Sequence, residues 1–316
     1  MINYIYSDEN GYHFSSSSNS LQELSGKEIL CIDLESPSFE EKSIVEEYFD
    51  ITFLSWHKAE EIESSSRYFE SGDVIRANSN FMRVVDGKFG YTPVSFILKN
   101  DILFAYHSEK TNGFYQVYER LVGQPSMEAT GWYVFLTLLD VRIDFDADLI
   151  EFVGREINAI SQRIRFKQEL EERLILEIAK LQEASMLLRE NIVDKQRVMS
   201  SILKSRRFPE DDKLQLRMML KDAGSLIDHT AFSFERLDFL QSTLMGLIDL
   251  EQNKIIKIFT VVTVIFSPPT LIASMYGMNF KFMPELSWEF GYPLCIFLMV
   301  TSSLLTLLYF KRKNWL

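Results

Sequence analysis

A row of small polar residues interrupts an otherwise apolar segment near the end of the chain. We call it the polar row; it consists of five polar residues and one isoleucine, which are Asn253, Ile256, Thr260, Thr263, Ser267 and Thr270. They recur at steps of three and four, so an α-helix, which turns once every 3.6 residues, carries them along one side. Their neutral oxygens could line a water-filled cation pathway, or the row could pack against a neighbouring helix, as Ser and Thr often do in membranes.

Two segments are apolar and long enough to cross a membrane, and the polar row lies in the first. We predict spans at 254–276 and 292–310. At ~1.5 Å per residue each reaches about 30 Å, the thickness of a bilayer core. Basic residues precede the first span and form the tail at 311–316. The positive-inside rule therefore predicts cytoplasmic termini and an external loop at 277–291.

Two prolines lie inside the first span. Pro268 and Pro269 lack backbone N–H groups, which leaves carbonyls near Val264 and Ile265 without their helical partners. Such carbonyls are costly in lipid, so this stretch of backbone should face protein or water. A simple packing kink is the alternative interpretation.

The first span is followed directly by the tripeptide Gly277-Met278-Asn279. Three further segments after this tripeptide are informative together with it. The later segments are Met283-Pro284-Glu285-Leu286, Phe290-Gly291-Tyr292-Pro293 and the basic tail. With these flanks, about the last 70 residues resemble the CorA-type magnesium/cobalt transporter family, whose signature is Gly-Met-Asn. The resemblance implies a funnel-shaped homopentamer in which the first span lines the pore and the second spans form an outer ring.

The resemblance also implies roles for the residues at the outer mouth. A ring of Asn279 carboxamides, with the Gly277 carbonyls and Met278, would form the selectivity filter. Neutral oxygens suit Mg²⁺, because this ion keeps several of its waters and can be held through them. Neutral oxygens also bind the ion weakly enough to release it, as conduction requires. Glu285 and Glu289 would raise the local cation concentration in the loop. Without the resemblance, the tripeptide would read as an ordinary helix stop.

The implied function is influx of Mg²⁺, with Co²⁺ and Ni²⁺ as further cargo, through a bacterial inner membrane. The membrane potential supplies ~2.3 kcal/mol per charge per 100 mV, so about 4.6 kcal/mol for a divalent ion. Two alternatives stay open: a zinc transporter of the same fold, and a membrane-anchored sensor or scaffold that conducts nothing. Self-association, lipid and divalent cations are the expected partners.

The acidic body suggests a way to gate such a channel. Residues 251–316 contain six Lys/Arg and three Glu, so they contribute +3 to the net charge of −12 and leave −15 on residues 1–250. The resemblance implies that cytoplasmic Mg²⁺ bridges carboxylates of neighbouring subunits and closes the pore. Asp222 and Asp228 are the candidate regulatory ligands; further candidates are Asp211, Asp212 and Asp249. Solvated helix carboxylates are the alternative for each.

The region before the spans divides at about residue 145. Residues 1–145 mix strands and short helices, with a buried strand near 28–34 and turn signals at Asp86-Gly87 and Asn100-Asp101, so we predict an α/β domain. Ser36-Pro37 predicts a helix start. Residues 146–253 show apolar 3-4 spacing typical of coiled coils. We predict one helix of about 40 residues or more, a break at Phe208-Pro209, and a return helix running into the first span.

Several function classes are disfavoured. No phosphate-binding Gly-rich motif with Lys-Ser/Thr occurs, the four histidines lack zinc-ligand spacing, and no nucleophilic triad can be assembled, so we expect neither an enzyme nor a catalytic cofactor. Mg²⁺ would be cargo and regulator. The acidic body disfavours nucleic acid as a partner. The two cysteines, Cys31 and Cys295, provide no disulfide framework, and we expect no signal peptide.

Overall fold

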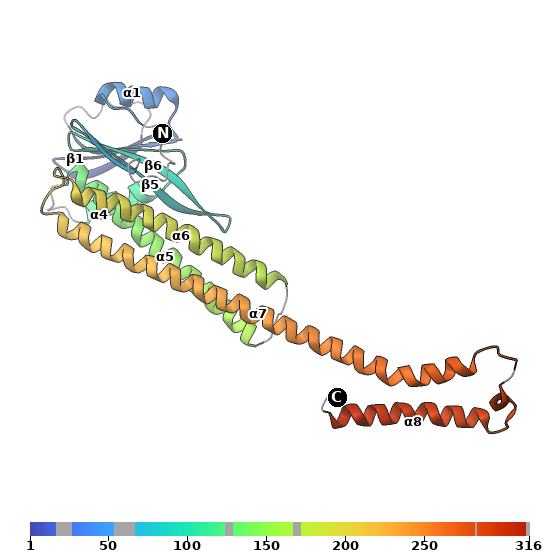
Figure 1. Cartoon of the computed structure of the whole chain (residues 1–316). Coiled ribbons are helices and arrows are strands. Elements are labelled where there is room, and N and C mark those ends of the chain that lie inside the picture. The colour runs from blue at the N-terminus through green and yellow to red at the C-terminus, as the bar shows by residue number, and fades with distance from the viewer. Residues whose placement is uncertain (17–26, 54–66, 124–128, 167–171, 282, 314–316) are drawn as a thin grey trace. The chain divides into compact units, whose positions relative to one another are not determined.

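The computed structural model describes residues 1–16, 27–53, 67–123, 129–166, 172–281 and 283–313 (Figure 1). It forms two compact units, Met1–Leu240 and Gln241–Leu316. The elements in chain order are β1 (Ile2–Asp8), β2 (Gly11–Ser16), β3 (Glu28–Glu35), α1 (Phe39–Phe49), β4 (Tyr68–Ser71), β5 (Val74–Val85), β6 (Lys88–Lys99), β7 (Ile102–His107), α4 (Gly113–Val122), α5 (Gly131–Arg165), α6 (Glu172–Lys204), α7 (Lys213–Tyr276), the 3₁₀ helix η2 (Pro284–Ser287) and α8 (Gly291–Arg312).

The first unit is built on one mixed sheet in the order β2-β1-β3-β7-β6-β5-β4. The pair β3 and β7 is parallel, and the other neighbouring pairs are antiparallel. The turns Asp86-Gly87 and Asn100-Asp101 have positive φ at all four residues, between 50° and 71°. Two-residue hairpins of this hand match the twist of the strands. Both predicted turns, and the α/β class of this unit, are confirmed.

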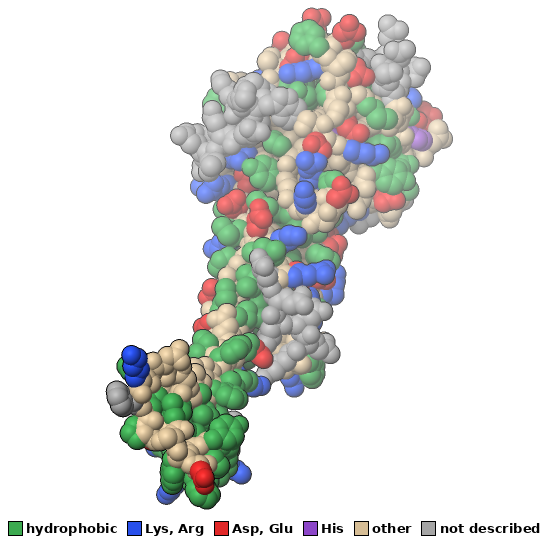
Figure 2. All heavy atoms as spheres, turned by 90° about the vertical axis from the view of Figure 1, so that its right-hand side faces the viewer, with side chains coloured by type: hydrophobic (Ala, Val, Ile, Leu, Met, Phe, Trp, Pro, Cys, Tyr) green, Lys and Arg blue, Asp and Glu red, His purple; other side chains and the backbone are tan. Residues whose placement is uncertain are grey.

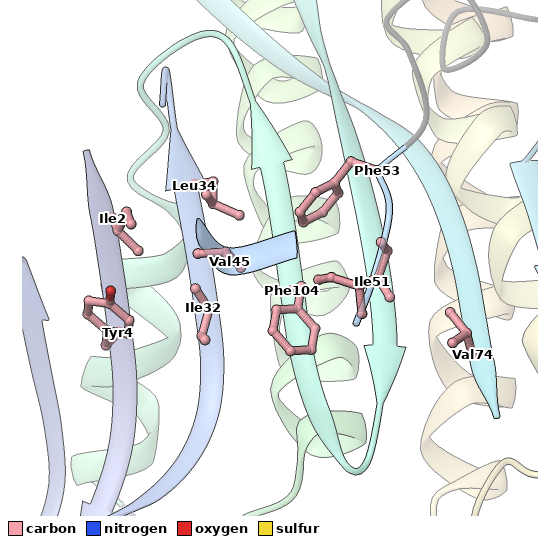
Figure 3. Packing of buried hydrophobic residues seen from close by; sticks show 10 residues of the cluster. Ile2, Tyr4, Ile32, Leu34, Val45, Ile51, Phe53, Val74 and Phe104 are labelled. Atoms are coloured by element: carbon pink, nitrogen blue, oxygen red, sulfur yellow. The ribbon is translucent and has the colours of Figure 1, made fainter. Parts of the chain in front are cut away.

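Helices cover both faces of the sheet (Figure 1). On one face, Val45 of α1 lies over Ile32 of β3 and Phe104 of β7 in a closed hydrophobic cluster (Figure 3). On the other, Phe96 of β6 meets Phe135 of α5 with ring centroids 5.0 Å apart. Strand β3 is buried from Leu30 to Leu34 because both faces are covered, which explains why Asp33 is its one polar residue in that stretch.

The first helix begins two residues later than the Ser36-Pro37 signal predicts. Ser38 is the N-cap of α1: its hydroxyl accepts the Glu41 N–H at 3.1 Å, and the Glu41 carboxylate accepts the Ser38 N–H at 2.8 Å. This reciprocal capping box satisfies two N–H groups that a lone hydroxyl cannot. Ser36 has φ 43° and forms the turn that leaves β3.

The single long helix predicted before the break at Phe208-Pro209 is wrong, because the structure has two helices there. Helix α5 ends at Arg165 and α6 begins at Glu172. Arg163 and Glu177 form an ion pair at 2.6 Å, although 14 residues of one helix would separate them by ~21 Å. The chain therefore reverses, and the apolar stripes of the two helices bury each other instead of facing water. Lys167 and Glu171, two polar members of the predicted seam, lie outside the described residues.

Helix α7 packs along α5 within the first unit. Arg236 of α7 donates to Asn158 of α5 at 2.7 Å. Within the first unit, the buried residues of α7 alternate steps of three and four when the half-buried Leu226 is counted, and are Leu216, Met219, Ala223, Thr230, Ser233, Leu237 and Leu240. The predicted coiled-coil spacing is therefore confirmed, but two positions that it placed inside, Phe234 and Gln241, are wrong. The residues before them, Ser233 and Leu240, are the buried ones, and Phe234 is 37 % exposed.

Fully buried charges join α5 and α6 to the sheet. Lys195 of α6 and Asp146 of α5 form an ion pair at 2.8 Å, and both side chains are 0 % exposed. Lys195 also donates to the carbonyl of Asn80 in β5 at 3.1 Å. Asp194 accepts the Asn80 N–H at 2.9 Å. Adjacent residues of α6 thus bond both the N–H and the carbonyl of Asn80, which fixes the register of helix against strand.

The second unit contains the end of α7 and all of α8. Both helices are long and apolar enough to cross a membrane. In Figure 2 the lower end of the molecule, nearest the viewer, carries many hydrophobic and few charged side chains. The two predicted spans thus correspond to the last part of α7, ending at Tyr276, and to Gly291–Arg312.

Candidate functional site: a polar helix face in the membrane

The six residues of the polar row lie on α7, and all six are exposed. A different face of this part of α7 is covered: Val261 is 3 % exposed, and Ile265, Pro268 and Ile272 are partly buried. At 100° per residue, the mean direction of the polar row lies about 140° from the mean direction of the covered positions. The row therefore points away from whatever covers Val261.

Helix α8 contacts this covered face at Ile265. The Ser303 hydroxyl of α8 donates to the Ile265 carbonyl of α7 at 3.3 Å. This is the carbonyl that would accept from residue 269 in a regular helix, where Pro269 has no N–H. The prediction that a carbonyl freed by the prolines meets protein is confirmed at Ile265. Sequence reasoning missed Ser303, although Thr301-Ser302-Ser303 is a polar interruption in an otherwise apolar span.

The threonines of the row donate to their own helix. The hydroxyls of Thr260, Thr263 and Thr270 bond the carbonyls four residues earlier, each at 2.8 Å. Each hydroxyl proton is thereby used, while the oxygen keeps lone pairs that can accept another bond. Such a face accepts hydrogen bonds from water. The water molecules that surround a hydrated divalent cation are hydrogen-bond donors of this kind. The same bonds let the row pack against a helix, so the geometry is compatible with both interpretations.

The signature tripeptide closes α7 with a tight turn. Gly277 N–H bonds the Ala273 carbonyl at 2.9 Å, and Met278 N–H bonds the Met275 carbonyl at 3.3 Å. Gly277 does not adopt the left-handed conformation that often ends a helix, since its φ is not positive. A methyl group there would instead stand 3.2 Å from the Ala273 carbonyl oxygen. Gly277, Met278 and Asn279 are all exposed, as a ring of copies around an axis would require.

The loop after the signature is held by a close backbone contact. A Cβ atom on Gly291 would stand 2.4 Å from the Glu285 carbonyl oxygen, so only glycine fits where α8 starts against η2. Ser287 caps η2 by donating to the Pro284 carbonyl at 2.8 Å. The side chains of Glu285 and Glu289 are exposed. The loop thus presents both carboxylates to solvent and none to the helix pair.

The acidic candidates for regulation are not assembled within one chain. Asp222 and Asp228 are exposed on α7, and six residues separate them, so they do not share a face. Within the described residues, no group of three His, Cys, Asp or Glu side chains could hold a metal ion. Partial burial and the adjacent Asp211 raise the pKa of Asp212.

The chain matches the family described as "CorA-like Mg2+ transporter protein" over residues 26–312. It is 36 % identical over 293 residues to a magnesium transport protein CorA of Wolinella succinogenes, with 91 % of each chain covered. It is 35 % identical over 288 residues to that of Escherichia coli K12, covering 90 % of this chain and 91 % of the relative.

A solved structure has the same fold throughout. "The complete structure of CorA magnesium transporter from Methanocaldococcus jannaschii" superposes with a TM-score of 0.83 at 18 % identity, covering 100 % of this chain and 99 % of that one. The predicted fold class, an α/β domain with long helices and a two-helix membrane hairpin, is therefore confirmed. By sequence match over nine tenths of its length, this chain belongs to the CorA-like Mg²⁺ transporter family.

Proposed function

We propose that this chain is one subunit of a membrane channel that carries Mg²⁺ into the cell. The observation that carries the proposal is the placement of the polar row on the face of α7 opposite Val261 and α8. Packing within the hairpin does not account for that face. The curated relatives of similar length are named magnesium transport proteins, which supports Mg²⁺ as cargo.

One helix with one polar face encloses nothing, so several copies must surround an axis. We propose a homopentamer, with the α7 rows inward and α8 outward. A second observation supports self-association: α7 exposes apolar side chains at multiples of seven residues, Met218, Phe232 and Phe239, at 54 %, 57 % and 69 %. Repeated apolar side chains exposed on a helix mark an interface. In the assembly they would pack against a neighbouring copy.

The outer mouth would select the ion. In a ring of copies, Asn279 carboxamides and Gly277 carbonyls present neutral oxygens, with Met278 completing the filter. These oxygens would contact Mg²⁺ through its retained waters. Co²⁺ and Ni²⁺ are similar hydrated divalent ions, and we propose that they pass as well. Glu285 and Glu289 would raise the local cation concentration. Zn²⁺ as the main cargo is the competing proposal and an outcome of the flux assay.

Transport would follow the membrane potential and therefore needs a gate. A divalent ion gains about 4.6 kcal/mol per 100 mV, which supports roughly a thousandfold accumulation. We propose that cytoplasmic Mg²⁺ closes the channel by bridging carboxylates of neighbouring subunits, with Asp222 and Asp228 as the candidates. Both termini would lie in the cytoplasm and the loop outside, since the basic residues flank the spans on one side.

Ion flux into liposomes that contain only the purified chain tests the proposal. An interior Mg²⁺ dye should report uptake that grows with an inside-negative potential. Asn279→Ala should reduce the rate sharply, while Glu289→Gln, which removes only a loop charge, should reduce it slightly. Parallel assays with Co²⁺, Ni²⁺ and Zn²⁺ dyes rank the cargo. Absence of flux for every divalent ion would refute a channel and favour the non-conducting sensor or scaffold.

A further inference from the structure

A cavity of about 360 Å³ opens in the first unit between the sheet and helices α4 and α5. Its walls come from β5 and β6, from the end of β7, from the loop before α4, and from one face of α5. A volume of this size holds a small organic molecule. The cavity belongs to Met1–Leu240 and contains none of the residues proposed for conduction or gating.

The walls of this cavity are basic although the chain is acidic. Four basic side chains line it, Arg83, His107, Lys110 and Arg142, and no Asp or Glu does. Two of the four have acidic partners outside the wall: Arg83 pairs with Glu109, and His107 with Asp33 at 2.6 Å. Lys110 is exposed and has no ion pair among the described residues. In a chain of net charge −12, this concentration of positive charge indicates an anionic ligand.

Arg142 is the strongest of these observations, because it is buried without a carboxylate of its own. Its side chain is 5 % exposed and its guanidinium lies between the rings of Phe81 and Phe145, 4.9 and 4.4 Å from their centroids. One Nη donates to the Met82 carbonyl, but Nε has no hydrogen-bond partner. The nearby Asp146 is already paired with Lys195. A buried guanidinium with an unused donor is costly unless something accepts from it.

The start of α4 adds further donors at the same wall. Its N-cap, Asn112, makes no side-chain capping bond, and the first turn of this ten-residue helix holds no acidic residue. Thr111, Asn112 and Gln116 line the cavity. The first N–H groups of a helix have no partner within it, and their partial positive charge favours anions. In α4 the Gly113 N–H bonds the Thr111 hydroxyl at 3.4 Å, so the start of the helix contributes mainly this partial charge and the polar side chains named above. Lys110, Arg142 and these residues line the same cavity.

We propose that this cavity binds a small organic phosphate whose anionic head meets Lys110, Arg142 and the start of α4. The remaining wall is apolar, with Phe81, Val94 and Phe145. That wall suits an aromatic or apolar body attached to the phosphate, and it distinguishes such a ligand from free phosphate. Burial lowers the pKa of Arg142 despite the nearby Asp146 carboxylate, and a bound anion would oppose that effect.

Calorimetric titration of the detergent-purified full chain, in buffer with chelator and no divalent ion, tests the site. The probes are ADP, inorganic phosphate and adenosine. ADP should bind in the micromolar to millimolar range, phosphate more weakly, and adenosine not measurably. Lys110→Gln should weaken ADP binding about tenfold or more, since it removes a charge-assisted hydrogen bond. Lys221→Gln, an equally exposed change on α7, should leave it unaltered.

Four results would overturn the proposal. One is no heat of binding for ADP up to millimolar concentration. The second is equal binding of ADP and adenosine, which would mean that the phosphate is not recognised. The third is equal binding of ADP and phosphate, which would mean that the apolar wall does not contribute to binding. The fourth is an ADP affinity that Lys110→Gln does not change. None of these depends on ion flux, so the site and the proposed channel are tested separately.

Discussion

The buried pair of Asp146 and Lys195 makes the sharpest prediction about what holds the first unit together. Asp146→Leu should destabilise the unit strongly, because it leaves the Lys195 ammonium in a space from which water is excluded. Lys195→Met should do the same to the Asp146 carboxylate. The double variant should be much more stable than the sum of the two losses predicts, since it removes both charges together.

The magnitudes follow from burial. Both side chains are 0 % exposed at 2.8 Å, and loss of one partner of such a pair costs about 3–5 kcal/mol. Against a total stability of about 5–15 kcal/mol, either single change approaches unfolding. In the double variant the Asn80 carbonyl still accepts from Asn191 at 2.9 Å. Its loss should therefore be about 1–3 kcal/mol, and the coupling energy at least about 3 kcal/mol.

Urea unfolding of the detergent-purified full chain, followed by pulse proteolysis of the first unit, gives these free energies. Arg155→Gln is the matched control: its pair with Glu151 is 3.7 Å long and the two side chains are 66 % and 74 % exposed, so it should change stability by less than about 0.5 kcal/mol. Single variants that each lose less than 1 kcal/mol, or a double variant as unstable as the sum, would refute the reasoning about this pair.

Three further outcomes follow from single contacts. Gly131→Ala should lower the unfolding free energy by about 1–3 kcal/mol or more in pulse proteolysis, because its Cβ would stand 2.3 Å from the Asp101 carbonyl oxygen. Its control is Gly154→Ala, which lies in open space within α5 and should stabilise the unit by up to about 1 kcal/mol. Ser303→Ala should destabilise the hairpin by about 0.6–1.7 kcal/mol in detergent unfolding, and Ser302→Ala, whose hydroxyl bonds only the Met299 carbonyl of its own helix, should not. Burial lowers the pKa of His107, but Asp33 and the Glu109 carbonyl more than reverse this, so the folded pKa is raised above 6.5. Stability from His107 is therefore complete below pH 6.5 and disappears as pH rises through the folded pKa, and His107→Gln should flatten this loss above pH 6.5 in thermal melts. A wild-type chain that gains stability over that range relative to the variant would contradict the assignment.

Local patterns predicted much of this fold, because their causes lie within a few residues. The turns at Asp86-Gly87 and Asn100-Asp101 need positive φ, which those residue types tolerate, so the hairpins were readable. The apolar run of β3 reflects burial on both faces. The two spans follow from length and composition alone. Even the freed carbonyl of Ile265 was predictable from Pro269, four residues later.

What sequence reasoning missed depends on contacts between distant residues. The α5–α6 reversal is set by packing partners such as Arg163 and Glu177, and 3-4 spacing looks the same in one long helix as in two antiparallel ones. The start of α1 was misplaced because Ser36 and Ser38 both suit an N-cap, and only the Glu41 contact decides. The face of α7 that meets α8 was hidden, since apolar residues lie on several sides of this part of the helix and their spacing does not say which side is covered.

The direct test of the account is the water exposure of the polar face of α7 in the membrane. Single cysteines at Thr260, Thr263 and Ser267, in a Cys295→Ser background, should react with a charged thiol reagent, and high Mg²⁺ should slow the reaction. A cysteine at Val262, which the helix turns about 130° from the row, should stay unreactive. Cys31 is buried and adds little background. Equal unreactivity at all four positions would contradict the account, because the row would then be a packing surface and α7 would line no pore.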